Sequence, residues 1–125
     1  MAGYDVALRN AQLDAITTFA GNAALLQAYT APQPATGGAA TTKLAQWTLG
    51  TPFAAAAAAA VLSPTLPADT TGITNGQVEW FRIYKSDGTT FVMDIPYSQV
   101  TLNTRNVVTG LPCKVLGFSI TGGNA

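Results

Sequence analysis

The chain has 125 residues with six basic and six acidic side chains, so its formal net charge at neutral pH is zero. Charged residues make up only 10% of the sequence, whereas soluble domains usually carry about 25%. This balance argues against nucleic-acid binding and against a polybasic membrane patch, because both depend on clustered Lys and Arg. The length is that of one ordinary domain, and we expect a single domain over residues 1–125 whose weakly charged surface suits contact with other proteins.

The first predicted element is a helix over residues 5–20. Val6, Leu13 and Ile16 fall on one face of such a helix. Asp5 is a suitable N-cap, and a Gly-Asn pair follows the last turn as a stop signal. The apolar stripe is wide enough for the helix to pack on a sheet or against a neighbouring subunit.

A strand predicted over residues 24–30 leads into a loop at 31–42, with the sequence APQPATGGAATT. Pro32 and Pro34 stiffen the start of this loop, and a Gly-Gly pair loosens its middle. The loop has no apolar anchor of its own. Long loops of this kind are often functional, or become ordered only by a partner.

A half-buried strand is predicted over residues 43–49, with Trp47 turned inward. The next segment, 53–62, contains seven consecutive alanines and lies between Pro52 and Pro64. Alanine favours a helix, but the segment is short and its Val-Leu ending favours a strand. The residues alone leave helix and strand equally supported.

A β-hairpin is predicted over residues 78–95. Its turn contains Asp87 and Gly88 between two alternating apolar runs, which is a strong hairpin signal because such turns need residues that accept positive φ. Trp80 and Phe81 point to opposite faces, so we expect both faces of this strand to be covered.

Two further strands complete the prediction. A short strand is expected at 100–102, and a closing strand at 113–120. In the closing strand one face would carry Lys114, Leu116, Phe118 and Ile120, and the other Cys113, Val115, Gly117 and Ser119. Several short strands with turn signals predict a mainly β fold, an antiparallel β-sandwich or jelly-roll-like barrel over 24–121 with the N-terminal helix at 5–20.

The residue inventory gives little support to catalysis or to cofactor binding. Histidine is absent, which removes Ser-His-Asp triads and the imidazole base, and a single cysteine, Cys113, provides neither an internal disulfide nor a zinc site. We expect no cofactor and no metal. The N-terminal sequence lacks the features of a secretory signal, and the longest apolar run, 53–62, is far shorter than the roughly 20 residues that span a bilayer.

Two weaker functional hypotheses remain open. Glu79 and Asp94 could face each other across the hairpin as the acid/base pair of a glycosidase; neutralisation by Arg82 or Lys85 is the simpler interpretation. The aromatic side chains of Trp80, Phe81 and Tyr84 could stack on sugars or bases, although such a cluster on a central strand more often belongs to a core.

Several segments, in order along the chain, resemble a family of small structural proteins of tailed phages and prophages. These are RNAQLDA at 9–15, LQAYTAPQPA at 26–35, the Phe/Ala-rich segment 53–61, WFRIYKSDGT at 80–89, LNT at 102–104 and FSIT at 118–121. The resemblance covers most of the chain and favours a strand at 53–62.

The resemblance implies a non-enzymatic virion protein, most simply a capsid cement or decoration protein that bridges major capsid proteins on the capsid surface. It implies synthesis in the host cytoplasm, the major capsid protein and copies of the chain itself (a dimer or trimer) as partners, and no role for nucleic acid or a membrane. The alternative is a tail or head-fibre component that recognises a host glycan. The expected contact residues are Met1, Ala2, Gly3, Tyr4, Pro32, Gln33, Pro34, Thr36, Gly37, Gly38, Gly123, Asn124 and Ala125.

Overall fold

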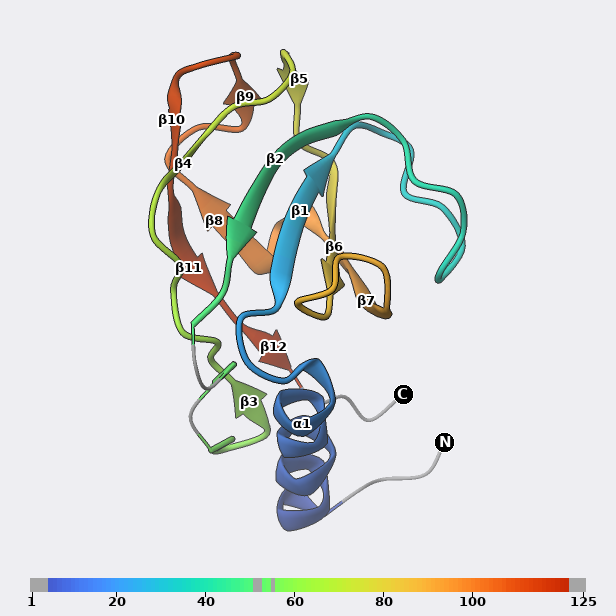
Figure 1. The fold of residues 1–125 in the computed structure, drawn as a ribbon. Coiled ribbons are helices and arrows are strands. Elements are labelled where there is room, and N and C mark those ends of the chain that lie inside the picture. Colours follow the sequence, from blue (N-terminus) through green and yellow to red (C-terminus); the bar gives the residue numbers. More distant parts are fainter. Residues whose placement is uncertain (1–4, 51–52, 55, 122–125) are drawn as a thin grey trace.

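The structure is a computed structural model that describes residues 5–50, 53–54 and 56–121. Its elements in chain order are α1 (Val6–Ala20), β1 (Leu25–Tyr29), β2 (Lys43–Thr48), β3 (Val61–Leu62), β4 (Thr70–Thr71), β5 (Gly76–Gln77), β6 (Trp80–Tyr84), β7 (Phe91–Pro96), the 3₁₀ helix η1 (Tyr97–Gln99), β8 (Val100–Leu102), β9 (Asn106–Val107), β10 (Pro112–Cys113), β11 (Val115–Phe118) and β12 (Ile120–Thr121). Figure 1 shows α1 at one end of the molecule and β5, β9 and β10 at the other.

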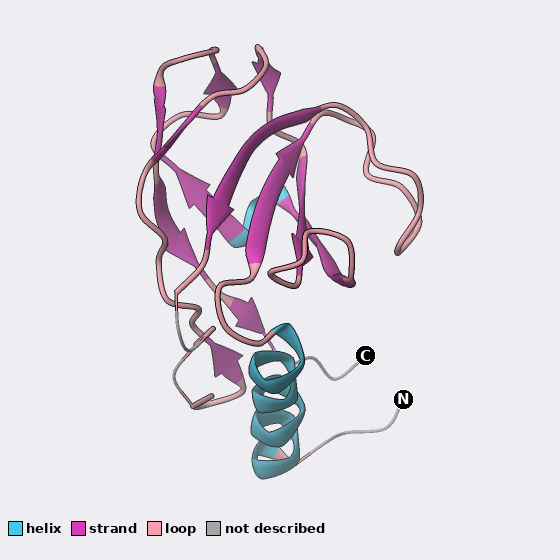
Figure 2. Ribbon diagram, in the orientation of Figure 1, coloured by secondary structure: helices cyan, strands magenta, loops and turns pink. Residues whose placement is uncertain are grey.

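The largest sheet is antiparallel, with four strands in the order β2-β1-β6-β7. The remaining strands form antiparallel pairs: β10 with β4, β11 with β8, β12 with β3, and β5 with β9. The described chain is therefore mainly β with one N-terminal α-helix, as predicted, and its strands form no closed barrel (Figure 2).

The predicted helix is confirmed. The Asp5 carboxylate accepts the backbone N–H of Ala7 at 2.9 Å, and the helix ends at Gly21, which has a φ of 72°. Leu13 is buried, and Ile16 packs against the core from its partly buried position. The side of α1 away from the core remains exposed.

The predicted inward orientation of Trp47 is also confirmed. Its side chain is 1% exposed, and its ring lies 6.4 Å from that of Phe81, centroid to centroid. The indole N–H donates to the backbone carbonyl of Cys113 at 3.1 Å, so the buried polar atom is satisfied. This contact ties the large sheet to the C-terminal strands.

In the alanine-rich segment 53–62, the predicted strand forms only at the end, as β3 (Val61–Leu62), and the described residues before it form isolated bridges and a turn and no helix. Ala59 and Ala60 have φ values of 51° and 61°. They form the centre of a tight turn closed by two backbone hydrogen bonds between Ala58 and Val61, of 3.1 and 2.9 Å. Positive φ at both central residues corresponds to a type I′ turn, which here is built from alanine.

Side chains of α1 explain why alanine propensity does not decide this segment. Asp14 Oδ1 accepts the backbone N–H of Ala57 at 2.7 Å, and Asn10 Oδ1 accepts that of Ala60 at 2.9 Å. These bonds hold the backbone N–H groups that a helix would need for itself. Tertiary contacts with α1 thus override the local preference.

The closing strand predicted over 113–120 is divided into three short strands, each with a different partner strand. Its register shifts between Val115 and Gly117, which breaks the predicted alternation. Leu116 is 50% exposed, whereas Phe118 is 6% exposed. The prediction that these two side chains share a face is wrong.

Candidate protein interface

The loop at 31–42 connects β1 to β2, and its base is closed by hydrogen bonds. The backbone N–H of Thr30 donates to the carbonyl of Thr42 at 3.1 Å. The Thr41 hydroxyl donates to the carbonyl of Thr30, and the indole N–H of Trp80 donates to the same oxygen at 2.8 Å. The loop therefore leaves the sheet at a fixed position.

A buried ion pair holds the tip of the loop. Arg82 on β6 lies opposite Asp94 on β7, and its Nε and Nη2 donate to the two carboxylate oxygens at 2.6 and 3.2 Å. The same Nη2 donates to the carbonyl of Gly38 at 2.7 Å, and Asp94 Oδ2 accepts the N–H of Gly37 at 3.0 Å. The two charged side chains are 5% and 2% exposed. Together they replace the apolar anchor that the loop lacks.

Aromatic rings surround the Arg82 guanidinium. Its central carbon lies 5.0 Å from the ring centroid of Trp80, 5.3 Å from that of Phe91 and 5.9 Å from that of Tyr84. Cation–π attraction of this kind is stronger when the cation is removed from water. Hydrogen bonding to Asp94 raises the pKa of Arg82 above its ordinary value and outweighs the opposing effect of burial.

Tyr29 completes the polar layer beneath the loop. Its ring stacks on Trp80 with centroids 4.6 Å apart, and its hydroxyl donates to the side-chain oxygen of Gln27. Burial, together with the nearby Tyr84, raises the pKa of Tyr29 to about 12. The phenol is thus neutral at physiological pH and remains a hydrogen-bond donor.

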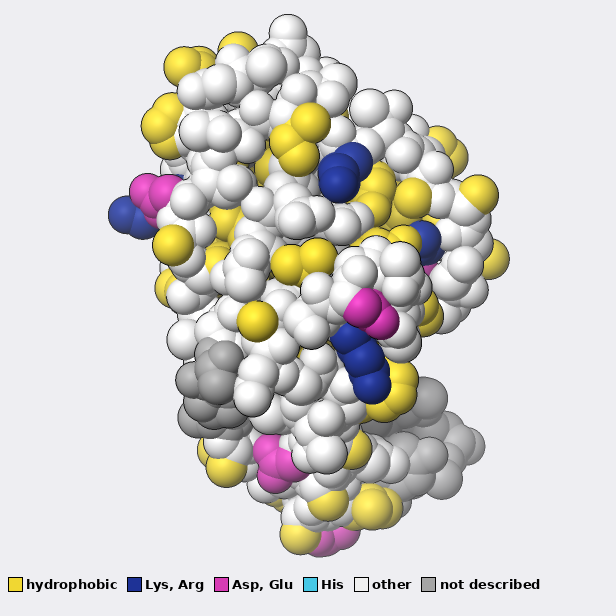
Figure 3. All heavy atoms as spheres, viewed as in Figure 1, with side chains coloured by type: hydrophobic (Ala, Val, Ile, Leu, Met, Phe, Trp, Pro, Cys, Tyr) yellow, Lys and Arg dark blue, Asp and Glu magenta, His cyan; other side chains and the backbone are white. Residues whose placement is uncertain are grey.

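The predicted contact residues of the loop lie on the surface. Four of them, Pro32, Gln33, Thr36 and Gly37, are exposed, and Pro34 and Gly38 are half-buried. None carries a charge. On the face seen in Figure 3, charged side chains are scattered and not gathered into one patch. The other predicted contact residues, Met1, Ala2, Gly3, Tyr4, Gly123, Asn124 and Ala125, lie outside the described residues.

The proposed carboxylate pair is not brought together. The register places Arg82, and not Glu79, opposite Asp94. Glu79 instead forms an ion pair with Arg105 at 2.8 Å. The prediction that the two carboxylates face each other is therefore wrong, whereas neutralisation of Asp94 by Arg82 is confirmed.

Trp80 does not form part of an exposed aromatic platform. It is fully buried, between Tyr29 and the Arg82 guanidinium. Phe81 is buried on the opposite face, and Tyr84 is half-buried with its hydroxyl accepting a hydrogen bond from Arg82 at 3.3 Å. Core packing accounts for most of this cluster.

The described part of the chain shows neither a metal site nor a helix that could span a membrane. Within the described residues, no group of three or more Cys, Asp and Glu side chains could hold a metal ion. Cys113 is buried, and burial raises the pKa of its thiol. The described helices include none that is long and apolar enough to cross a membrane.

The role of Arg82 and Asp94 as the anchor of the loop did not emerge from the sequence. The available signal is their position, because both lie six residues from Gly88 in the hairpin turn. A basic and an acidic residue at equal distances from a turn form a cross-strand pair when the register permits.

Comparison with family models, with curated proteins and with solved structures finds no match for this chain.

Proposed function

We propose that the chain is a non-enzymatic structural protein of a tailed-phage virion, a capsid cement or decoration protein that bridges major capsid proteins and stabilises the head. The observation that carries this proposal is loop 31–42, which presents uncharged exposed residues while Arg82 and Asp94 hold it from below. A surface that is ordered before binding loses less conformational entropy on association. The family resemblance described above supplies the kind of partner.

The low charge of the chain supports the same proposal. Small neutral surfaces give modest contacts singly, but many copies on one shell act together through multivalency. The partners are then the major capsid protein and further copies of the chain, as a dimer or trimer on the capsid surface. In this proposal the four-stranded sheet and the smaller strand pairs form the two layers of a β-sandwich or jelly-roll-like domain.

A tail or head-fibre component that recognises a host glycan is the alternative. It has less support because two of the three aromatic side chains expected to stack on sugars, Trp80 and Phe81, are fully buried, and the third, Tyr84, is half-buried. Imaging of intact particles at side-chain resolution separates the two by showing the chain on the head or on the tail.

Deletion of the gene from the phage or prophage that encodes this chain tests the cement role. We expect purified wild-type particles to contain the protein in stoichiometric amounts. Particles without it should lose their DNA at lower temperature and after milder osmotic shock. Unchanged heat and shock resistance of the deleted particles would show that the protein does not stabilise the shell.

A surface variant connects this role to the loop. Thr36→Lys places a charge on the exposed loop, and Ser98→Lys places the same charge on exposed η1 as a matched control. Re-addition of each protein to deleted particles should show at least about tenfold weaker binding for the loop variant only. Equal binding of both variants would remove the loop from the interface.

A further inference from the structure

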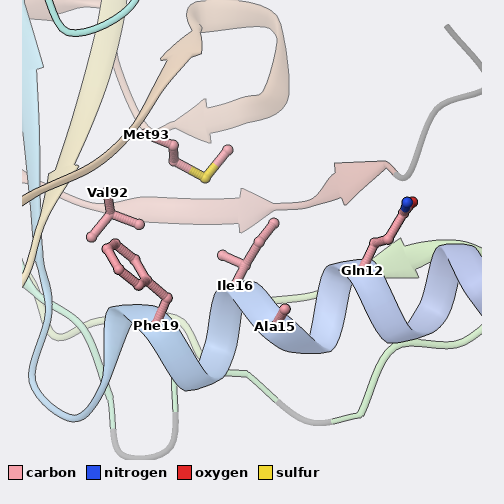
Figure 4. A pocket seen from close by; sticks show the side chains of 6 residues that line it. All are labelled: Gln12, Ala15, Ile16, Phe19, Val92 and Met93. Atoms are coloured by element: carbon pink, nitrogen blue, oxygen red, sulfur yellow. The ribbon is translucent and has the colours of Figure 1, made fainter.

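A hollow of about 260 Å³ lies between α1 and β7, on a different part of the molecule from loop 31–42. It is lined by Gln12, Ala15, Ile16, Phe19, Val92 and Met93. Figure 4 shows Phe19 beside Val92 and Ile16 facing Met93 across it. All of the lining side chains except that of Gln12 are apolar.

The register of β7 gives this hollow one of its walls. Phe91 lies opposite Tyr84 and Met93 lies opposite Ile83, so Val92 is an extra residue without a cross-strand partner. Val92 and Met93 consequently both line the hollow, although strict alternation would turn neighbouring side chains to opposite faces.

The size of the hollow suits one large apolar side chain. An engineered apolar cavity of about 150 Å³ is large enough to bind benzene. Phe19, which forms one wall, is 51% exposed, so part of its ring is available to a partner. Burial of a large apolar side chain in a preformed pocket is a common centre of binding energy at protein interfaces.

A positive charge marks one end of the hollow. The Lys85 ammonium lies 4.2 Å from the ring centroid of Phe19. The two ion pairs within the described residues use Arg82 and Arg105, and Lys85 forms none there. Its charge contacts the Phe19 ring but pairs with no carboxylate of the described residues, so an acidic group of a partner could meet it next to an apolar one.

We propose that the hollow between α1 and β7 binds a segment of the partner protein that inserts one large apolar side chain beside Ile16, Phe19 and Met93 and places an adjacent carboxylate at Lys85. The identity of the partner rests on the proposed function, while the chemistry of the segment follows from the lining residues and from Lys85. The hollow is then a second contact surface, in addition to loop 31–42.

Methyl NMR tests the proposal directly. The chain has two methionines, so ¹³C-methyl labelling of methionine gives two signals, and that of Met93 reports on the hollow. The probes are two tetrapeptides, acetyl-Gly-Phe-Glu-Gly-amide and its counterpart with Lys in place of Glu. We expect the acidic peptide to shift the Met93 signal at millimolar concentration. It should bind about two- to fivefold more tightly than the basic peptide, the factor typical of a solvent-exposed ion pair.

Three variants locate the binding. Ala15→Trp fills the hollow from an exposed helix position and should weaken both peptides at least about tenfold. Ala7→Trp makes the same change at an exposed site about 12 Å away along α1 and should leave binding unchanged. Lys85→Gln should abolish the preference for the acidic peptide. Three results would each overturn the proposal. They are an unchanged Met93 signal with both peptides, equal weakening of peptide binding by the two Trp variants, and a retained preference for the acidic peptide in the Lys85 variant.

The peptide titration does not depend on the virion. Wild-type protein that binds deleted particles but neither peptide would contradict the segment proposed for the hollow and leave the cement role standing. Protein that binds the acidic peptide but is missing from purified particles would contradict the cement role alone.

Discussion

Removal of one member of the buried Arg82–Asp94 pair should strongly destabilise the fold. Asp94→Ala leaves a guanidinium that is 5% exposed without its carboxylate. Loss of one partner from a buried ion pair typically costs about 3–5 kcal/mol. A chain of this length has a free energy of unfolding of about 6–19 kcal/mol, so the loss is a large part of the total.

Urea denaturation measures this cost. With an m value of about 1–3 kcal/mol per molar urea, the midpoint should fall by at least about 1 M. The double variant Arg82→Met with Asp94→Leu removes both charges and keeps apolar volume, and it should recover most of the stability. The surface pair Arg105→Met with Glu79→Leu is the control. Its charged side chains are 37% and 35% exposed, and exposed pairs contribute about 0–1 kcal/mol, to which loss of the 2.7 Å bond from Arg105 Nε to the Val78 carbonyl adds about 0.5–1.5 kcal/mol.

The double variant also separates stability from loop order. Without the ion pair, the N–H of Gly37 loses its acceptor and the carbonyl of Gly38 loses its donor. Hydrogen exchange at the Gly37 amide should accelerate at least about tenfold in Arg82→Met/Asp94→Leu and stay unchanged in the control pair. A cost below about 1 kcal/mol for Asp94→Ala, or slow exchange at Gly37 in the double variant, would refute the anchoring role.

Four other outcomes are expected. Gly72→Ala places a Cβ 2.4 Å from the carbonyl oxygen of Val108, a backbone atom that cannot yield easily, and should cost about 1–3 kcal/mol in urea denaturation. The pKa of Tyr29 is raised from its ordinary value of 10 to about 12, so the stabilisation that the neutral phenol gives the fold is complete below pH 10 and is lost as the pH rises through 12. In an absorbance titration, the Tyr29→Phe variant should lack the tyrosinate step near pH 12. The pKa of Asp87 is lowered from its ordinary value of 3.8 to about 2, chiefly by its hydrogen bond with the Thr90 hydroxyl. The stabilisation that the ionised carboxylate gives the fold is therefore present above pH 3.8 and is lost as the pH falls through 2. Asp87→Asn should remove this acid dependence from the free energy of unfolding measured against pH. Deletion of Val92 should keep slow amide exchange in loop 31–42 but weaken peptide binding in the hollow, as measured by the methyl titration.

The elements that the sequence predicted well depend on local signals. Helix α1 follows from its apolar face and from the Asp5 cap, both of which lie within the segment itself. The hairpin follows from its turn, although only Gly88 has positive φ there, at 75°, whereas Asp87 contributes by accepting the N–H groups of Thr89 and Thr90. Neither element needs information from distant parts of the chain.

The elements that the sequence missed are decided by distant partners. The run of alanines turns where it does because Asn10 and Asp14 of α1 accept its N–H groups. The predicted closing strand breaks because its three pieces pair with β4, β8 and β3, which come from separate regions of the chain. Periodicity within 113–120 contains no information about those partners.

A single irregularity in β7 connects the two candidate surfaces. The backbone N–H of Lys85 donates to the carbonyl of Thr90, which sets the register next to the turn, and a regular ladder from that pair would place Met93 opposite Arg82. The extra residue Val92 shifts the register by one, so that Asp94 meets Arg82 and the loop gains its anchor. Val92 itself then lines the hollow beside α1.

Deletion of Val92 should leave the pairing of the neighbouring residues unchanged, because Phe91 and Met93 already lie opposite Tyr84 and Ile83 on either side of the extra residue. The shortened strand would form a regular ladder with Arg82 still opposite Asp94, and only the wall of the hollow would be lost. Deletion of Val92, which the hairpin signal did not predict as an extra residue, should therefore remove the hollow as a contact surface and leave loop 31–42 in place. Particles reconstituted with that variant would then show how much of the binding each surface provides.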